Sequence, residues 1–519
     1  RLFLVQGNKR MKADYLVVGS GLSGLVFGAL MAKSGKRVQI LEAHEFPGGF
    51  GHTFSMGGQH KFNAQLHYVW NCGEGQTVNK VLKQLGLDKN ITFERYDPNG
   101  FDHMKMPGYS LEIPSDSQEL IARLSALFPQ DCKKFEDFIE AVQKTSAGLN
   151  TFSSSMSPSN LLKNFSDTST TLKYLKSTLQ DVFDKFKLPQ EAQTLLALQW
   201  PDFLLPPNQL SFYAWVMLFT GYQGGAFYPN KHFEHVIDSL VQVIESNGGE
   251  ILYNHEVTDF NYHEGRITGV KYIELTTHKI GEYSADNTIC NMDPQKASEM
   301  IGLNEFSKSL RKKLNYDYSP SNFMAYCTVK GLDLRDYGFG KWNVFHTSHL
   351  NLNQAFADMY ERHDFSKLSF AITTPSLMTD DQSDRPEGQQ IMEFLTVANY
   401  DYFKQLKETD EKAYKKKKKE ILDVMIDTVE QHYIPNFRQH IAFKITGSPT
   451  TNERFCWSPK GNSYGSNMTP DNIGIGRLNH RSSIKNFYFC NASSGYAGFA
   501  GTFWTGANLY QELSGVSLV

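Results

Sequence analysis

Two apolar runs near the start of the chain enclose a glycine-rich turn and a helix-like stretch. Leu16–Val18 is apolar and β-prone, and Lys36–Glu42 contains a second β-prone run that ends in an acid. Between them, Leu22–Ser34 has helical character. Its small residues would let a helix pack closely on a sheet: Gly24, Gly28, Ala29 and Ala32. The pattern predicts a buried parallel strand, a tight turn, a helix and a second strand.

The spacing of the glycines gives this unit a chemical meaning. We expect Gly19 to form the tight turn, Gly21 to let the backbone approach a diphosphate, and Gly24 to allow close packing of helix on strand. The turn also contains Ser20, Leu22 and Ser23. Glu42, at the end of the second strand, can accept hydrogen bonds from ribose hydroxyls. These residues predict a dinucleotide-binding site at the start of the helix.

The pattern then changes several times along the chain. Residues 62–70 predict one short strand, and residues 77–220 predict helices joined by polar linkers, including 118–127 and 132–149. After that the first pattern returns, with a helix over 233–247, a hairpin over 259–272 and a strand over 285–290. Four β-prone runs predict a second sheet: Met324–Val329, Trp342–His346, Leu368–Thr373 and Ile391–Val397.

Two segments allow a membrane interpretation beside a plainer one. Leu210–Phe219 is aromatic but too short to span a bilayer, so it can form core or pocket wall, or lie at a membrane surface. Lys415–Lys419 is a solvated helix face or a contact with an anionic surface. The chain contains no run of about 18 apolar residues. A cytoplasmic location is expected, with peripheral membrane association left open.

Length and composition narrow the choice of function. The 519 residues predict two domains or a large interleaved pair, and a net charge of −3 does not favour nucleic acid as a partner. Aromatic residues make up 13% of the chain, which suits large apolar walls. Six scattered cysteines, without metal-site spacing, predict reduced structural thiols and no metal centre. Arg1–Arg10, ahead of Met11, is interpreted as a leader or tag remnant.

Further motifs identify a family resemblance. Gly48-Gly49-x-x-His52-Thr53-Phe54, followed by Phe62-x-x-x-Leu66-His67-Tyr68, resembles the flavoproteins that include retinol saturase, carotenoid cis-trans isomerase and bacterial phytoene desaturase. The closing segment, Gly447 to Gly506, continues the resemblance. It implies an α/β fold in which a Rossmann-like, glutathione-reductase-type FAD-binding domain is interleaved with an α+β substrate domain.

The resemblance and the pattern together divide the chain. The expected FAD-binding parts are residues 11–76, 220–300 and 445–519, and the expected substrate-domain parts are a helical, membrane-facing segment at 77–219 and a sheet-and-helix segment at 301–444.

The resemblance also implies cofactor contacts beyond the glycine turn. They fall at Ala43, Gly48, Gly49, His52, Thr53, Val257, Asn291, Asn491, Gly498, Phe499 and Ala500. The helix beginning at Gly498 would place its positive end against the N1/C2 edge of a reduced flavin. Two departures stand out. Asn63-Ala64-Gln65 and Asn491-Ala492-Ser493 occupy positions where relatives carry an acid, so flavin binding or chemistry can differ here.

The implied activity is hydride transfer at flavin N5, or redox-neutral isomerisation, on C=C bonds of a long hydrophobic polyene or unsaturated lipid. We expect His67, Tyr68 and Tyr496 to supply the acid or base, with His52 behind them. Each of these side chains has packing as its simpler role. The alternatives are an amine-oxidase-like flavoenzyme and a catalytically silent flavin-fold protein that serves binding or assembly.

Overall fold

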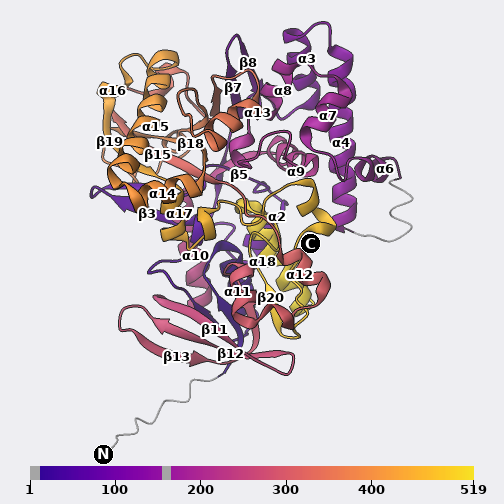
Figure 1. The fold of residues 1–519 in the computed structure, drawn as a ribbon, viewed down its shortest axis with the longest axis vertical. Helices are drawn as coiled ribbons and strands as arrows, with labels where there is room; N and C mark the ends of the chain where they lie inside the picture. The colour runs from indigo at the N-terminus through magenta and orange to yellow at the C-terminus, as the bar shows by residue number, and fades with distance from the viewer. Residues whose placement is uncertain (1–11, 155–164, 519) are drawn as a thin grey trace, which may run out of the picture.

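The computed structural model describes residues 12–154 and 165–518 (Figure 1). The leader or tag remnant predicted for residues 1–10 lies outside the described residues. One half of the fold is built on a five-stranded parallel sheet with the strand order β10-β2-β1-β14-β20. Its strands come from four distant parts of the chain: β1 (Ala13–Val18), β2 (Val38–Leu41), β10 (Glu250–Leu252), β14 (Ala285–Cys290) and β20 (Phe487–Phe489).

Three helices cover this sheet. α1 (Leu22–Lys33) packs between α10 (His232–Ser246) and α18 (Gly498–Ser514), the yellow helix of Figure 1. All residues of α1 except the last are buried. The two helices α1 and α18 pack closely, since a Cβ on Gly506 of α18 would lie 2.4 Å from the Ser23 carbonyl oxygen of α1. The predicted strand-turn-helix-strand unit is therefore present, and helix α1 is enclosed on all sides.

A three-stranded antiparallel sheet adjoins the parallel one at the bottom of Figure 1. It consists of β11 (His255–His263), β12 (Arg266–Glu274) and β13 (Lys279–Tyr283). The hairpin predicted around Glu264-Gly265 is confirmed, since β11 and β12 pair antiparallel across that turn, where both residues have positive φ. The sheet leads directly into β14 and so returns the chain to the parallel sheet.

A seven-stranded sheet forms the other half, with the order β19-β15-β18-β17-β16-β7-β8. The four predicted runs are its centre: β15 (Ser321–Lys330), β16 (Asn343–Thr347), β17 (Ser369–Thr373) and β18 (Gln389–Ala398). Its edges come from β19 (Ile441–Gly447) and from β7 (Asp102–Met106) with β8 (Tyr109–Ile113). Helices α14 (Tyr400–Thr409), α15 (Glu411–His432), α16 (Phe437–His440) and α17 (Pro449–Cys456) lie beside it.

The prediction of helices throughout residues 77–220 is wrong in its first third. After α2 (Thr77–Leu85), the chain forms β6 (Phe93–Arg95) and then β7 and β8. β7 pairs parallel to β16, so the burial of alternate residues in β7 comes from the second sheet, which distant sequence supplies.

The helical part begins at residue 117. It contains α3 (Ser117–Leu127), α4 (Cys132–Ser154), α6 (Phe165–Lys173), α7 (Leu179–Phe186), α8 (Gln190–Ala197) and α9 (Phe212–Gln223). The remaining helices of the described residues are α11 (Pro294–Ile301), α12 (Lys308–Leu314) and α13 (Leu352–Phe356).

The single strand predicted over residues 62–70 is also wrong. The chain forms β4 (His60–Asn63), paired with β3 (Thr53–Met56), and then a separate β5 (Val69–Trp70), paired with β9 (Ala226–Pro229). Between the two strands, Tyr326 donates to the Ala64 carbonyl and Tyr222 donates to the Tyr68 carbonyl. Side chains thus take the place of a strand neighbour across this gap.

Both segments with a membrane interpretation have protein partners. Most of α9 is buried, and Trp215 stacks on Phe219 with 4.6 Å between ring centroids. In α15, Lys415, Lys416, Lys417 and Lys419 pair with acids of the same helix, while Lys418 donates to the Thr446 carbonyl. Among the described residues, no helix combines the length and apolar character needed to cross a bilayer.

Candidate functional site

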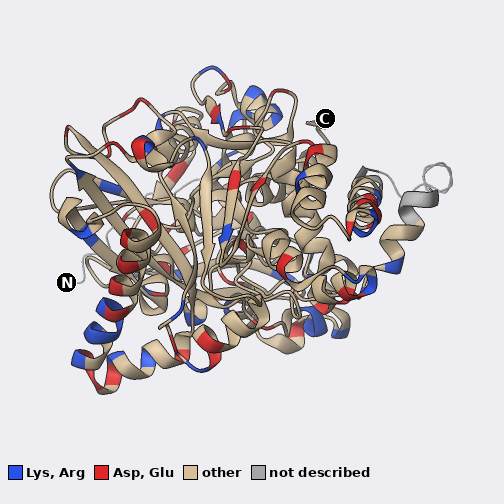
Figure 2. Ribbon diagram, turned by 90° about the horizontal axis from the view of Figure 1, so that it is seen from above, with Lys and Arg blue, Asp and Glu red and all other residues tan. Residues whose placement is uncertain are grey.

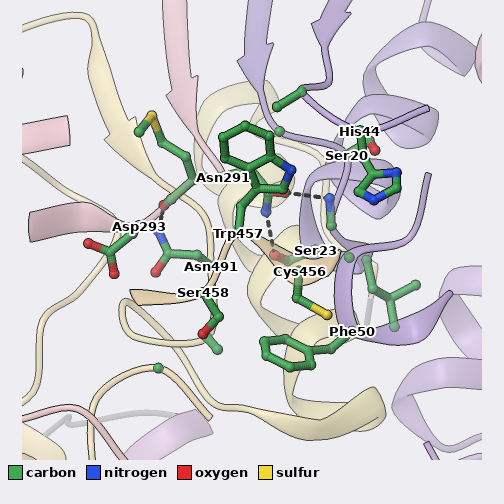
Figure 3. Close-up of a pocket in the computed structure, with 18 of the residues that line it drawn as sticks. Ser20, Ser23, His44, Phe50, Asn291, Asp293, Cys456, Trp457, Ser458 and Asn491 are labelled. Carbon is green, nitrogen blue, oxygen red and sulfur yellow. Dashed lines mark hydrogen bonds between the residues drawn. The ribbon is translucent and has the colours of Figure 1, made fainter. Parts of the chain in front are cut away.

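A cavity of about 310 Å³ lies where β1, β2 and β14 end (Figure 3). Its walls come from all parts of the chain: the turn after β1, the ends of β2 and β14, the start of β11, the segment 455–465 and the start of α18. Such a position, at the carboxyl edge of a parallel sheet, is where dinucleotides bind in doubly wound folds.

Glycines in the turn after β1 and in the facing loop leave the backbone free of side chains at the cavity. Gly19 and Gly48 have φ values of 104° and 109°, which side chains other than glycine rarely adopt. A Cβ on Gly49 would lie 3.2 Å from the Gly21 Cα. Within the described residues, no side chain caps the start of α1 and its first turn carries no acid. Its free N–H groups and positive dipole end therefore suit a diphosphate.

Asn291 is the side chain that holds the turn after β1 in place. Its Oδ1 accepts from the Gly21 N–H at 2.7 Å, and its Nδ2 donates to Ser23 Oγ at 2.9 Å and to the Cys490 carbonyl. Figure 3 shows the amide reaching from the end of β14 to the turn. A Cβ on Gly24 would lie 2.7 Å from Asn291 Cγ, so the third glycine of the motif leaves room for this amide.

Glu42 lies at the end of β2, where the sequence predicted it. Its Oε2 accepts from both the backbone N–H and the hydroxyl of Ser20, each at 2.6 Å, and its Oε1 accepts from the His44 N–H at 2.8 Å. The carboxylate is held in one orientation and keeps lone pairs for hydroxyl donors from a ligand.

The second helix start at the cavity belongs to α18. Among the described residues, no side chain caps it and its first turn carries no acid, so its N–H groups are available to a ligand. Asn491, at a departure from the family pattern, is used by the protein itself: Oδ1 accepts from the Ser493 and Ser494 N–H groups, and Nδ2 donates to the Cys290 and Met292 carbonyls, both at 3.2 Å. Its amide thus shapes the turn.

An acid at the cavity does exist, but on a different element. Asp293, the N-cap of α11, lines the cavity, accepts from Tyr318 at 2.8 Å and caps Lys296 N–H at 2.9 Å. Burial raises the pKa of this carboxyl. Pairing of β14 with β1 brings this acid to the cavity.

Most predicted cofactor residues come together at this one cavity. The lining includes Gly19, Ser20, Gly21, Leu22, Ser23, Glu42, Ala43, Gly48, Gly49, Val257, Asn291, Asn491 and Gly498. Five others are not part of that lining: Gly24, His52, Thr53, Phe499 and Ala500. Phe499 packs on Phe233 and Phe503, and Thr53 begins β3. The contacts predicted for all these residues remain predictions.

His52 supports the glycine loop from behind. Its Nδ1 lies 2.6 Å from the Gly49 carbonyl oxygen and therefore carries the proton that it donates there. Burial lowers the pKa of His52 to about 4, so the ring is neutral at physiological pH.

The three residues predicted to be catalytic have three separate environments. His67 Nδ1 lies 3.0 Å from Glu393 Oε2, and both side chains are nearly enclosed. Tyr68 reaches Asp102 and Asp202. Tyr496 lies under the buried Arg477, whose guanidinium carbon is 5.6 Å from the ring centroid. Their catalytic roles remain predictions.

Sequence reasoning missed four charged residues near these side chains, of which Asp102, Glu393 and Arg477 are buried and Asp202 is half-buried. Arg477 donates to the carbonyls of Gly495 and Ala492, behind the turn that leads into α18. A local pattern does not single out these residues, since each is buried by elements far away in the sequence.

Comparisons with known proteins agree on the family. The model of the flavin-containing amine oxidoreductases matches residues 22–507. All-trans-retinol 13,14-reductase of Danio rerio is 23% identical over 95% of this chain and 84% of its own length, and the chloroplastic prolycopene isomerase of Arabidopsis thaliana is 23% identical over 89% and 76%.

A solved structure shows the same fold. Cyclohexylamine oxidase from Brevibacterium oxydans superposes with a TM-score of 0.63 at 13% identity and covers 97% of this chain and all of its own. The motifs, the cavity at the edge of the sheet and the extent of the family match lead to one conclusion: this chain belongs to the flavin-containing amine oxidoreductase family.

Proposed function

We propose that this chain binds FAD and acts on C=C bonds of a long hydrophobic polyene or unsaturated lipid. The dinucleotide form of the flavin is supported by the two uncapped helix starts at one cavity, which suit a diphosphate at α1 and a flavin ring edge at α18. Gly19–Ser23 would hold the diphosphate, Glu42 the ribose, and Val257 would lie near the adenine.

One observation carries the choice of substrate. The reductases named for all-trans-retinol and the isomerases named for prolycopene align with this chain over most of its length, across both halves of the fold. The family model alone names only amines. The aromatic interior around α9 agrees with an apolar substrate, because flat apolar walls exclude water from a polyene.

When bound, the flavin would supply hydride exchange at N5. The chain's own residues would orient the substrate and handle the proton. His67 is suited to this because Glu393 fixes its Nδ1, and its Nε2 is buried without a hydrogen-bond partner among the described residues. Tyr496 is suited by the neighbouring guanidinium of Arg477.

A water-insoluble substrate also requires a source. We propose that the protein takes it up at a membrane surface through peripheral contact. Flotation with liposomes that contain the polyene tests this: a floating fraction that depends on the vesicles supports the proposal, and protein that stays at the bottom of the gradient contradicts it.

The enzyme proposal is tested by the products. Protein reconstituted with FAD, in oxidised and in reduced form, is incubated with a panel of polyenes. The products are separated by chromatography, and their masses are measured by mass spectrometry. A gain of two hydrogens identifies saturation, a loss of two identifies desaturation, and unchanged mass with altered retention identifies isomerisation. Unaltered polyenes under all conditions would contradict the proposal.

Oxidation of an amine is the second candidate, and one observation favours it. The acids Asp102 and Asp202 lie together in the interior, and an ammonium group would neutralise them. A panel of primary amines run beside the polyenes separates the two candidates, since amine oxidation releases hydrogen peroxide and an aldehyde when oxygen is the acceptor.

A further inference from the structure

A fully buried and a partly buried carboxyl group meet at one phenol beside the seven-stranded sheet. Tyr68 Oη lies 3.1 Å from Asp102 Oδ2 and 2.9 Å from Asp202 Oδ2. Asp102 is in β7, beside the parallel strand β16, and Asp202 follows α8 in a short 3₁₀ turn, Trp200–Asp202. No role in the proposed cofactor site accounts for this cluster.

The hydrogen count of the cluster requires an additional proton. The Tyr68 hydroxyl has one hydrogen and can donate to only one of the two carboxyl oxygens. Within the described residues, no Lys, Arg or His pairs with either acid. Two carboxylates without a cation in an enclosed site are strongly unfavourable, so one carboxyl must hold a proton.

The hydrogen-bond partners show which carboxyl holds it. Asp102 receives donors from Gln199 Nε2 and from Asn343 Nδ2, the latter at 3.1 Å, so its charged form is stabilised. Tyr68 is the single hydrogen-bond partner of the Asp202 carboxyl group among the described residues. A consistent chain results: Asp202 O–H donates to Tyr68 Oη, and Tyr68 O–H donates to the Asp102 carboxylate.

The surrounding titratable groups are neutral. Tyr96, Tyr222 and Tyr464 face the pair from the loop after β6, from α9 and from the segment before β20, and burial raises the pKa of each phenol well above its usual value. Tyr222 stacks on Tyr68 with 4.0 Å between centroids. Burial raises the pKa of Asp102 to about 7, and burial followed by the charge of Asp102 raises that of Asp202 to about 8.

The pair differs in access as well. The Asp102 side chain is fully buried, whereas the Asp202 side chain is half-buried. The preceding Pro201 carbonyl accepts from Tyr464 Oη at 3.2 Å, and Ser463 and Gly465, on either side of Tyr464, line the cofactor cavity. Asp202 is thus the more accessible member of the pair, and its neighbour Pro201 contacts a segment that lines the cofactor cavity.

We propose that Asp102 and Asp202 share one proton at neutral pH through Tyr68, and that Asp202 exchanges this proton with the substrate. This rests on the proposed function. In saturation, the C=C π bond would break: one carbon would form a C–H bond with a hydride supplied by a bound reduced flavin, which would be left oxidised, and the other would form a C–H bond with the proton released as the Asp202 O–H bond breaks. The pair then regains a proton from solvent. Desaturation runs these transfers in reverse, with the oxidised flavin as hydride acceptor.

Infrared spectroscopy on protein labelled with ¹³C at aspartate carboxyl groups tests the shared proton without any substrate. A protonated carboxyl band is expected at pH 7, shifted in D₂O, lost on titration to pH 9 and absent in Asp202→Asn. The control Asp336→Asn, at an exposed site, should keep the band. Absence of a titrating protonated aspartate in the wild-type protein would overturn the proposal, and this arm needs no variant to fold.

Thermal unfolding gives a second readout. Because the folded pKa values of the pair lie above those of unfolded aspartate, the folded state holds a proton that the unfolded state releases, and stability falls as pH rises toward 8. Asp202→Asn should lose much less stability than the wild type between pH 6 and 9. An equal loss in both proteins would contradict the proposal.

Turnover then separates this inference from the proposed function. Asp202→Asn should lower polyene turnover by about 10²- to 10⁴-fold with unaltered substrate binding, and Asp202→Glu should recover part of it. Polyene turnover that survives in Asp202→Asn leaves the function standing and overturns the proton role. A titrating Asp202 band in a protein that changes no polyene overturns the function and the exchange with substrate.

Discussion

At the scale of single residues, Asn291 connects the parts of the cofactor cavity. It joins the turn after β1 to the ends of β14 and β20 through Gly21, Ser23 and Cys490. A backbone turn rich in glycine has high conformational freedom before folding, and a side chain that fixes it lowers the cost of binding a ligand there.

Replacement of Asn291 tests this connection. Asn291→Ala leaves the Gly21 N–H and the Ser23 hydroxyl without this partner, so we expect a loss of about 1–3 kcal/mol in the free energy of unfolding and a reduced flavin content. Denaturant titration and flavin absorbance measure the two effects. Asn287→Ala, from the same strand but remote from the cavity, serves as the control, and equal behaviour of the two variants would contradict the role.

His52 predicts a specific pH dependence. Its pKa is lowered to about 4 when folded, below the unfolded value, so protonation favours the unfolded state as pH falls from about 6.5 to 4, and stability declines across that window. His52→Gln should lose less stability over the same range. Unfolding midpoints at several pH values measure this. An unchanged slope in the variant would show that other groups cause the decline.

At the scale of elements, helix α1 contains two glycines with opposite expected behaviour. A Cβ at Gly24 would lie 2.7 Å from Asn291 Cγ, whereas one at Gly28 would meet the movable end of Ile40 at 3.3 Å. Alanine favours a helix over glycine by about 1 kcal/mol. Gly28→Ala should therefore be neutral or stabilising, and Gly24→Ala should lower both the melting temperature and the flavin content. Similar melting temperatures for both variants would contradict this packing.

The sequence predicted elements well where their cause is local. The Gly19–Gly24 spacing identifies β1 and α1, and the hairpin follows from Glu264-Gly265. The sequence did not predict elements that are buried by residues far away along the chain. β7 has polar and charged residues at Asp102, His103 and Lys105, and it becomes a strand because β16 lies beside it. For the same reason, the sequence did not indicate that Asp102 and Asp202 lie close together, since they are a hundred positions apart in the chain.

At the scale of the whole molecule, the chain passes repeatedly between two sheets. The parallel sheet receives strands from both ends of the sequence, and the seven-stranded sheet draws β7 and β8 from before residue 114 and the rest from after residue 320. Figure 2 shows Lys and Arg positions interspersed with Asp and Glu positions along the ribbon, in keeping with a net charge of −3.

The flavin spectrum under anaerobic conditions tests the central claim most directly. The FAD-reconstituted protein is mixed with a polyene in the oxidised and in the reduced state while flavin absorbance and polyene isomers are followed. We predict that a polyene reoxidises the reduced flavin, or reduces the oxidised flavin, or is isomerised without a net change in flavin absorbance. A flavin that every polyene leaves unchanged, with no isomer formed, and that a primary amine reduces would contradict the account.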